Sequence, residues 1–460
     1  MDFPVFHTDF FGNRMLIAVI AILHVVVNHS LAVGAAPLIT ALEWRGFRQR
    51  SEAWDRLAYK ILRVCFVITT SVGALTGVGI WFSAALVNPA AIGSLIRVFF
   101  LAWLTEWVVF VIEVCLILAY YLTWKTWGQR HKRAHIALGG LLSLSSWLTM
   151  AIIVAILGFM MHSGHWGTER SFFSAVLNPI YLPQLAFRTP LAMAAAGLFT
   201  LFLIPFLTAR TDPIRTAAIR FVSAWTLLWV PLCALGGWWY WAAIPDWMQQ
   251  LHPVALTTMG FGDWYRQVIV LLGISAAVVL GVAVWGVCCP RFLPRWCLVA
   301  PFLLLVGMLG SYERVREFIR KPFVIHDYLY ANGIRVEDYP LLQEQGMLRH
   351  ATYVAHREVT AVNRFACGQD VFRLSCSRCH TTRGINGVLR KFDTLYGGEP
   401  WNPEDIKLTI RTMHVSRPYM PPFPGNEAEL DALSHYVCGL QTFPVPLAGD
   451  QVDGVRLPSD

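Results

Sequence analysis

Eight long apolar runs are the strongest constraint on what this chain can fold into. A helix of about 20 apolar residues crosses the hydrocarbon core of a bilayer, where only a segment that satisfies its own backbone hydrogen bonds is stable. The runs span residues 15–42, 64–87, 98–123, 136–161, 189–209, 221–245, 267–290 and 296–312. The last run is short, and we expect its helix to continue into the charged stretch ERVREFIRKP. The sequence therefore predicts an all-α chain, with a polytopic membrane bundle followed by a small α-helical domain.

The composition agrees with a membrane protein and excludes a nucleic-acid-binding one. Charged residues make up 14% of the chain, whereas about 25% is usual for soluble proteins. The net charge of +8 comes mostly from short Lys and Arg clusters between the apolar runs, which is a topology signal. The first run, from Met15 to Leu42, has no Asp, Glu, Lys or Arg. It is much longer than the core of about 7–15 residues in a cleavable signal, so we expect it to stay as a spanning helix.

The distribution of positive residues predicts the orientation of the chain. The loops after helices 1, 3, 5 and 7 carry 15 Lys and Arg residues, and the opposite loops carry five. Loops rich in Lys and Arg stay in the cytoplasm. We therefore expect a multi-pass protein of the bacterial inner membrane, with its N-terminus and everything after helix 8 in the periplasm.

The C-terminal region carries the clearest chemical motif, Cys376-Ser-Arg-Cys379-His380. The C-x-x-C-H pattern attaches a c-type haem. Two thiols add to the vinyl groups of the porphyrin, and the adjacent imidazole ligates the iron. A zinc or thiol-redox reading of the two cysteines is disfavoured by the following histidine and by the predicted periplasmic location. The motif predicts one covalent haem c, and with it electron transfer.

The second axial ligand of this haem is expected further along the chain. Met420 lies in the segment RPYMPPF, where prolines stiffen the loop that presents the thioether. A methionine ligand raises the reduction potential of haem iron. Met413 and His414 are the alternatives that the sequence leaves open.

Two helices frame the haem motif in this reading, and the region resembles a class I cytochrome c domain. Residues 368–374 read as a short helix before the motif, and residues 427–440 read as an amphipathic closing helix. Cys367 and Cys438 lie at the ends of these two helices, either as a disulfide or as two free thiols. The predicted division of the chain is a membrane domain (1–322), a linker (323–358), a c-haem domain (359–445) and a tail (446–460).

Ionisable residues inside the predicted membrane helices are costly and are functional candidates. His24 and His29 lie five residues apart, so they point about 140° apart around one helix and are not expected to serve one ligand. Glu106 and Glu113 lie seven residues apart, which puts both carboxylates on one helix face about 10 Å apart. Such a pair suits a proton relay or contacts with a haem.

The membrane half resembles subunit I of cytochrome bd-type quinol oxidases along most of residues 10–325. Arg14 precedes His24 by ten positions, as in that family. The resemblance implies that Arg14 meets haem propionates and that His24 binds a high-spin haem iron. The pair Thr76-Gly77 resembles the family's Ala-Thr-Gly segment.

Further motifs follow in the family's order. Glu113 precedes Trp124 by eleven residues and matches the second of two family glutamates, and Glu106 falls one place from the first. The segment from Glu317 through Arg320 to Ile325 resembles Glu-x-x-Arg-Gln-Pro-Trp-x-Ile. By this resemblance Glu317 ligates the other high-spin haem and Arg320 lies at the haem site.

The departures from the family pattern concern the low-spin haem b and the quinol site. The histidine ligand of that haem is expected near Phe187 or Arg188, and its methionine partner is expected where Val268 stands. The quinol-binding loop is reduced to about residues 246–266, and the family's ninth helix has no counterpart. These changes imply that quinol input is lost and that the c-haem replaces it.

Two functions follow from these expectations. The first is a cytochrome c-linked, bd-like terminal oxidase that reduces O₂ with one or two non-covalent haems of b or d type, to which Glu106 and Glu113 deliver protons. The alternative is an electron-transfer subunit of a larger membrane redox complex that reduces no oxygen itself, so enzymatic activity stays open here. Both imply a periplasmic cytochrome c or other redox protein as partner, and the resemblance implies a second membrane subunit like subunit II of the bd family.

Overall fold

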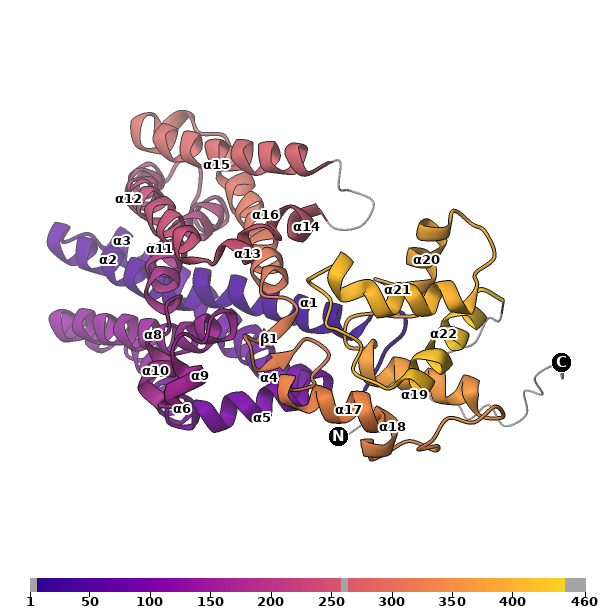
Figure 1. Cartoon of the computed structure of the whole chain (residues 1–460). Coiled ribbons are helices and arrows are strands. Elements are labelled where there is room, and N and C mark those ends of the chain that lie inside the picture. The colour runs from indigo at the N-terminus through magenta and orange to yellow at the C-terminus, as the bar shows by residue number, and fades with distance from the viewer. Residues whose placement is uncertain (1–5, 258–263, 443–460) are drawn as a thin grey trace. The chain divides into compact units, whose positions relative to one another are not determined.

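The computed structural model of the chain describes residues 6–257 and 264–442 (Figure 1). The predicted tail, and part of the shortened loop at 246–266, lie outside the described residues. The chain divides into two compact units. The larger unit comprises residues 20–80 and 93–320, and the smaller unit comprises residues 1–19, 81–92 and 321–460.

Eight helical spans in the described residues are long and apolar enough to cross a membrane, which confirms the predicted fold class. The first two are each interrupted by a π-helical turn and consist of α1 (Asn13–Val27), η1 (Asn28–Val33) and α2 (Ala35–Gln49), and of α3 (Glu52–Ile68), η2 (Thr69–Gly73) and α4 (Ala74–Val87). The others are α6 (Phe100–Leu122), α8 (Lys132–Met161), α11 (Tyr181–Leu207), α12 (Pro213–Ala243), α15 (Tyr265–Cys288) and α16 (Arg295–Ile319). Helix α16 continues into the charged stretch, as predicted.

Helix α11 is the central helix of the larger unit. The most apolar 18-residue stretch of α11 is 83% buried, whereas that of α6 is 6% buried, so α6 lies on the outside of the unit with most of its surface exposed. Small residues allow backbones to approach closely, as is usual in membrane bundles. A Cβ atom on Gly34 would lie 2.0 Å from the Ala192 carbonyl oxygen, and one on Gly236 would lie 2.2 Å from that of Ala186.

Local signals explain where several helices begin. Helix α12 starts after Asp212, whose side chain accepts a hydrogen bond from the backbone of Ile214, and Pro213 occupies its first position. Shorter helices connect the spans: α5 (Pro89–Val98), α7 (Trp127–Arg130), α9 (Trp166–Glu169), α10 (Phe172–Val176), α13 (Asp246–Gln249), α14 (His252–Thr257) and η4 (Pro290–Phe292).

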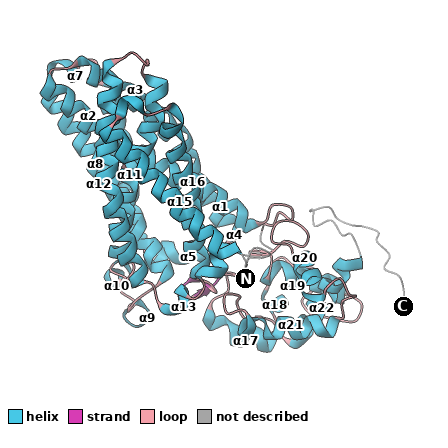
Figure 2. Ribbon diagram, turned by 90° about the horizontal axis from the view of Figure 1, so that it is seen from above, coloured by secondary structure: helices cyan, strands magenta, loops and turns pink. Residues whose placement is uncertain are grey.

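In its described residues the smaller unit is also helical, apart from one short antiparallel hairpin (Figure 2). Its elements after the last membrane helix are β1 (Phe323–Ile325), β2 (Leu329–Tyr330), η5 (Val336–Asp338), α17 (Tyr339–Gln345), α18 (Met347–His350), α19 (Arg364–Ser375), α20 (Val388–Tyr396), α21 (Pro403–Ser416) and α22 (Glu427–Thr442). The two helices predicted around the haem motif are confirmed as α19 and α22.

Helices α19 and α22 form the core of the smaller unit. The predicted apolar face of α22 is buried, including Leu433 and Tyr436. The two helices approach so closely that a Cβ atom on Gly368 would lie 2.1 Å from the Ala432 carbonyl oxygen. The segment before α19 packs into the same core, because the buried Glu429 carboxylate accepts hydrogen bonds from two backbone N–H groups at the start of α18.

Candidate functional site

The C-x-x-C-H residues lie on one tight turn directly after α19. Cys376 caps that helix, and its carbonyl oxygen accepts hydrogen bonds from the backbone N–H groups of Cys379 at 3.0 Å and His380 at 2.9 Å. The turn therefore gathers two thiols and one imidazole within five residues, which is the donor set that a covalently attached haem requires.

The environment of His380 leaves it ready to bind a metal. Its Nδ1 atom lies 3.2 Å from the Asn386 carbonyl oxygen, which can only accept, so Nδ1 carries the proton and Nε2 carries the lone pair. Burial, together with the nearby charges of Lys391, Arg14 and Lys321, holds the pKa of His380 well below its usual value. The imidazole is therefore neutral, which is its metal-ligating form.

Four cations surround this loop within the smaller unit. The Nζ atom of Lys391 lies 3.4 Å from His380 Nδ1, and that of Lys321 lies 3.8 Å from Cys379 Sγ. Arg14 and Arg417 interact electrostatically with Lys391, and burial with these neighbours lowers the pKa of Lys391 to about 8. A haem carries two propionate carboxylates, and clustered Lys and Arg side chains beside its ligands fit that charge.

Arg378, inside the motif, anchors the loop. Its buried guanidinium donates to the carbonyl oxygens of Val87 at 3.1 Å and Leu374 at 3.2 Å, and also to that of Asn332. Burial lowers the pKa of Arg378 to about 9. Gly333 takes a positive φ of 77° beside it, and a Cβ atom there would lie 2.8 Å from the guanidinium carbon. Sequence reasoning missed this anchor, because the two positions between the motif cysteines follow no fixed pattern.

Met420, the predicted second axial ligand, lies in a turn after α21. Its backbone N–H donates a hydrogen bond to the Arg417 carbonyl oxygen at 2.8 Å, and its own carbonyl oxygen accepts one from His414 Nδ1 at 2.5 Å. His414, one of the alternative ligands, therefore serves to position the loop that carries Met420. Met413, the other alternative, lies in the last turn of α21.

Cys367 and Cys438 are both free thiols, so the second of the two alternatives holds. Cys367 Sγ contacts the Glu358 carbonyl oxygen at 3.8 Å, and Cys438 Sγ contacts that of Trp401 at 3.1 Å.

His24 is also held in a metal-ligating form, within the larger unit. Its Nδ1 atom lies 3.1 Å from the Thr76 hydroxyl oxygen. That hydroxyl has a single proton, which it donates to the Val72 carbonyl oxygen at 2.6 Å, so it accepts from His24 Nδ1. Nε2 therefore carries the lone pair for a metal. A Cβ atom on Gly77 would lie 3.3 Å from the ring, so glycine lets the imidazole pack closely.

His29, five residues later, serves a different purpose. It lies in the π-helical turn η1, where its Nδ1 donates to the Val25 carbonyl oxygen at 3.0 Å. Its Nε2 accepts from Arg188 at 3.3 Å. Both ring nitrogens are used inside the protein, which agrees with the prediction that His24 and His29 do not share a ligand.

The two predicted carboxylates of α6 differ in their surroundings. Glu113 accepts hydrogen bonds from two hydroxyls of α8, Ser146 at 2.5 Å and Thr149 at 3.0 Å. Glu106 lies two turns earlier on the same helix and is half-buried. Hydroxyls bonded to a carboxylate can pass protons along such a row.

Glu317 and Arg320, at the end of α16, form an ion pair at 2.5 Å. The Arg320 side chain is buried and the Glu317 side chain is about a third exposed. The guanidinium therefore orients the carboxylate that the sequence assigned to a haem iron.

Two buried charge clusters of the larger unit were missed by sequence reasoning. One joins Arg188 to Glu313, and the other joins Glu43 to His135 at 2.7 Å and to Lys132 at 2.9 Å. The signal was present, because each is an ionisable residue within or beside an apolar run. The sequence does not indicate which of these residues pair, because the partners come from different helices.

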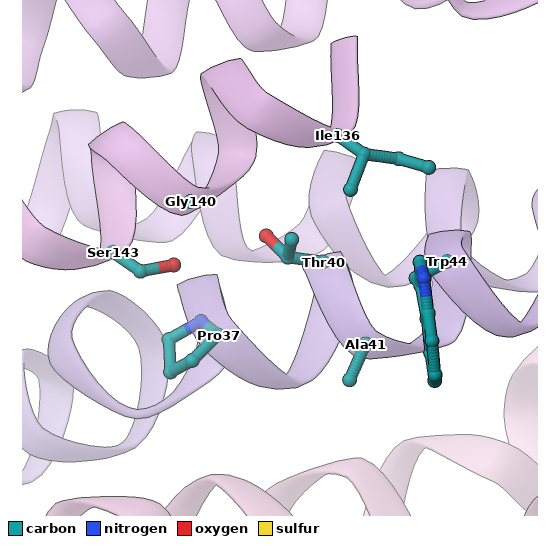
Figure 3. A pocket seen from close by; sticks show the side chains of 7 residues that line it. All are labelled: Pro37, Thr40, Ala41, Trp44, Ile136, Gly140 and Ser143. Atoms are coloured by element: carbon teal, nitrogen blue, oxygen red, sulfur yellow. The ribbon is translucent and has the colours of Figure 1, made fainter. Parts of the chain in front are cut away.

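An open pocket of about 380 Å³ lies between α2 and α8 (Figure 3). Its lining is mostly apolar, with the hydroxyls of Thr40 and Ser143 and the indole of Trp44 as polar exceptions. None of the predicted haem ligands is among the residues that line it.

Comparisons with known proteins identify the C-terminal region. Residues 363–437 match the family described as cytochrome C oxidase, cbb3-type, subunit III. The C-terminal region is thus a cytochrome c domain, and the motif there carries covalent haem c. The protein is therefore a transmembrane electron-transport protein with a cytochrome c domain.

The fold of the membrane region has a solved counterpart. The structure of bd oxidase from Geobacillus thermodenitrificans is similar with a TM-score of 0.57, at 15% identity, over 69% of this chain and 90% of that chain. At this identity the likeness shows a shared fold, which agrees with the resemblance seen in the sequence. Among curated proteins no sequence matches the chain.

Proposed function

We propose that the chain is the haem-bearing subunit of a cytochrome c-linked, bd-like terminal oxidase that reduces O₂. The observation that carries this proposal is the imidazole of His24, whose Nδ1 bonds to the Thr76 hydroxyl so that Nε2 carries the lone pair that can bind iron, in a bundle with the bd oxidase fold. The same chain carries a cytochrome c domain, which supplies one-electron transfer when its haem is bound.

Residues of the smaller unit hold the haem c in this proposal. Cys376 and Cys379 form the thioether bonds, and His380 and Met420 supply the two axial ligands. Lys391, Lys321 and Arg417 bind the propionates. The domain lies in the periplasm, where it accepts electrons from a soluble cytochrome c or another redox protein.

Residues in or beside the membrane-spanning helices hold the membrane haems. His24 and Glu317 ligate one or two non-covalent haems of b or d type, Arg14 and Arg320 contact propionates, and Glu113 and Glu106 deliver protons. A second membrane subunit like that of the bd family completes the complex, and the bilayer surrounds it.

One observation favours the second candidate, an electron-transfer subunit without oxygen reduction. The resemblance expects the histidine ligand of a low-spin haem near Phe187 or Arg188, and its methionine ligand where Val268 stands. A chain that has lost one family haem has lost part of the family's chemistry, and the remaining membrane haems then only relay charge.

Spectroscopy of the purified full chain separates these functions. A reduced spectrum recorded with and without CO reports an iron with an open coordination position, and acid–acetone extraction separates covalent from non-covalent haem. The oxidase predicts a CO-reactive, extractable haem that is lost in His24→Leu, with the covalent haem unchanged. Extractable haem that does not react with CO would favour the relay, and a spectrum of haem c alone would overturn both membrane-haem roles.

A further inference from the structure

A buried charge cluster in the larger unit joins helices α11 and α16. Arg188 Nη2 lies 2.7 Å from Glu313 Oε1, and Arg316 Nε lies 2.8 Å from Glu313 Oε2. The Arg188 side chain is 1% exposed, that of Glu313 is 7% exposed and that of Arg316 is 11% exposed. The three charges are thus almost completely removed from solvent.

The cluster carries more positive than negative charge. Two guanidinium groups face one carboxylate, which leaves one positive charge without a counter-charge. His29 adds no charge to the cluster, because its Nε2 accepts a hydrogen bond from Arg188 and its ring is therefore neutral. Glu317 also attracts Arg316, but it is paired with Arg320, so three guanidinium groups against two carboxylates still leave one positive charge in excess. An unbalanced charge in a membrane bundle is expensive unless another anion balances it.

Two buried guanidinium nitrogens indicate where that anion binds. Arg188 Nε and Arg316 Nη1 are buried and have no hydrogen-bond partner among the residues that the structure describes. A buried donor without a partner costs about 1–3 kcal/mol, more when it is charged. One carboxylate would account for both the charge and the open donors, with one oxygen toward each guanidinium group.

We propose that Arg188 and Arg316 bind the propionate carboxylate of a non-covalent haem in the larger unit. This inference rests on the proposed function, which places such a haem there. Arg316 directly precedes Glu317, a proposed iron ligand, on the same helix. If Glu317 ligates the iron, Arg316 is therefore the residue directly before that ligand in the sequence.

The surroundings of Arg188 support a role toward propionate rather than iron. Phe187 packs against Tyr240 and Tyr312, with ring centroids 6.1 Å and 5.0 Å apart, and the Arg188 guanidinium lies 5.3 Å from the Tyr312 centroid. Aromatic rings occupy the space beside position 188, and its side chain offers N–H donors and no lone pair. The position that resembles an axial-ligand site has thus become a cation site.

Three variants of the full-length chain test the proposal. Arg188→Gln removes the excess positive charge, Arg188→Lys retains it, and Glu313→Gln increases it. Transfer of non-covalent haem to apomyoglobin measures how tightly the haem is held, with the covalent haem c as internal standard. Redox titration of the non-covalent haem measures the electrostatic effect of each change.

The proposal predicts opposite effects for the two neutralising variants. Arg188→Gln should hold the haem about tenfold less tightly, as expected for loss of a hydrogen bond to a charged group, and its reduction potential should fall. Arg188→Lys should stay close to the wild type. Glu313→Gln should keep its haem, and the potential should rise, because positive charge near the iron favours the reduced state.

Three different results would contradict the proposal. Equal haem loss in Arg188→Gln and Glu313→Gln would show that the cluster only holds the helices together and would overturn the inference. Unchanged affinity and potential in Arg188→Gln would also overturn it, while leaving the proposed function in place. A wild-type chain without extractable haem would overturn the proposed function and this inference together.

Discussion

Asp9 accepts two hydrogen bonds from Thr382, one from its backbone N–H and one from its hydroxyl, each 2.6 Å long. These residues are 373 positions apart, and both belong to the smaller unit. The contact continues at Ile385, whose N–H donates to the Phe10 carbonyl oxygen at 3.0 Å. The segment that contains Asp9 and Phe10 therefore packs against the loop that follows the haem-attachment motif.

This contact should depend on pH in a defined direction. Although burial opposes it, the hydrogen bonds from His7 and Thr382 hold the pKa of Asp9 below its ordinary value. A carboxylate with a lowered pKa in the folded state adds stability above its unfolded pKa of about 4, and that stability is lost as the pH falls through the folded value. The protection of the amide hydrogens of residues 6–12, measured relative to their intrinsic exchange rates at each pH, should therefore be high at neutral pH and fall below about pH 4.

Asp9→Asn should remove this pH dependence and weaken the contact by about 1 kcal/mol at neutral pH, which is the usual net value of such hydrogen bonds. Glu344→Gln, at an exposed position of the same unit, is the control and should leave the exchange of residues 6–12 as it is. If Asp9→Asn keeps the acid sensitivity of the wild type, another group controls the segment.

Replacement of Arg378 should damage the haem loop. Arg378→Met leaves three carbonyl oxygens, those of Val87, Asn332 and Leu374, without their charged donor. Loss of a buried charged partner of this kind costs about 2–4 kcal/mol. The expected result is a lower unfolding temperature of the cytochrome c domain and a smaller fraction of chains with covalent haem, measured by haem-stained gels. Arg373→Met, on the helix before the motif, should have little effect on either quantity.

The close helix crossing in the larger unit provides a test with a matched control. A Cβ atom on Gly236 of α12 would overlap the Ala186 carbonyl oxygen of α11, so Gly236→Ala must push the two helices apart. Overpacking of this kind costs about 1–3 kcal/mol. Gly273→Ala in α15 meets no atom within 4 Å and should be neutral. Thermal unfolding in detergent measures both, and equal stabilities would show that the crossing is more adaptable than its geometry indicates.

The elements that follow from a single stretch of sequence were predictable, and the contacts between distant stretches were not. Each spanning helix depends on its own apolar run, and the haem motif depends on five consecutive residues, so both could be read directly. Arg188 and Glu313 are 125 residues apart, and nothing in either segment indicates that they pair. No pattern in the sequence predicted the π-helical turn that holds His29.

The hydrogen bond between Thr76 and His24 should determine how well the larger unit holds a haem. Thr76→Val removes the oxygen that accepts from His24 Nδ1, and the ring can then rotate or change its tautomer. Loss of such a partner typically weakens metal binding by about 10–100-fold. Thr70→Val, in the same span, is the control, because within the described residues the Thr70 hydroxyl bonds to the Phe66 and Val67 carbonyl oxygens of its own helix. Equal retention of extractable haem in both variants would mean that His24 is not a ligand.

The assignment of Met420 can be decided by the reduction potential of the haem c. Met420→Ala removes the thioether that raises this potential, so the midpoint should fall by on the order of 0.1 V, within the range of about 0.8 V that axial ligands span. Met413→Leu should leave the midpoint unchanged. His414→Gln should have a smaller effect than Met420→Ala, because it removes only the donor that holds the Met420 carbonyl oxygen. A fall in the midpoint for Met413→Leu with none for Met420→Ala would transfer the ligand role to Met413, and the loop between α21 and α22 would then serve only to cover the haem.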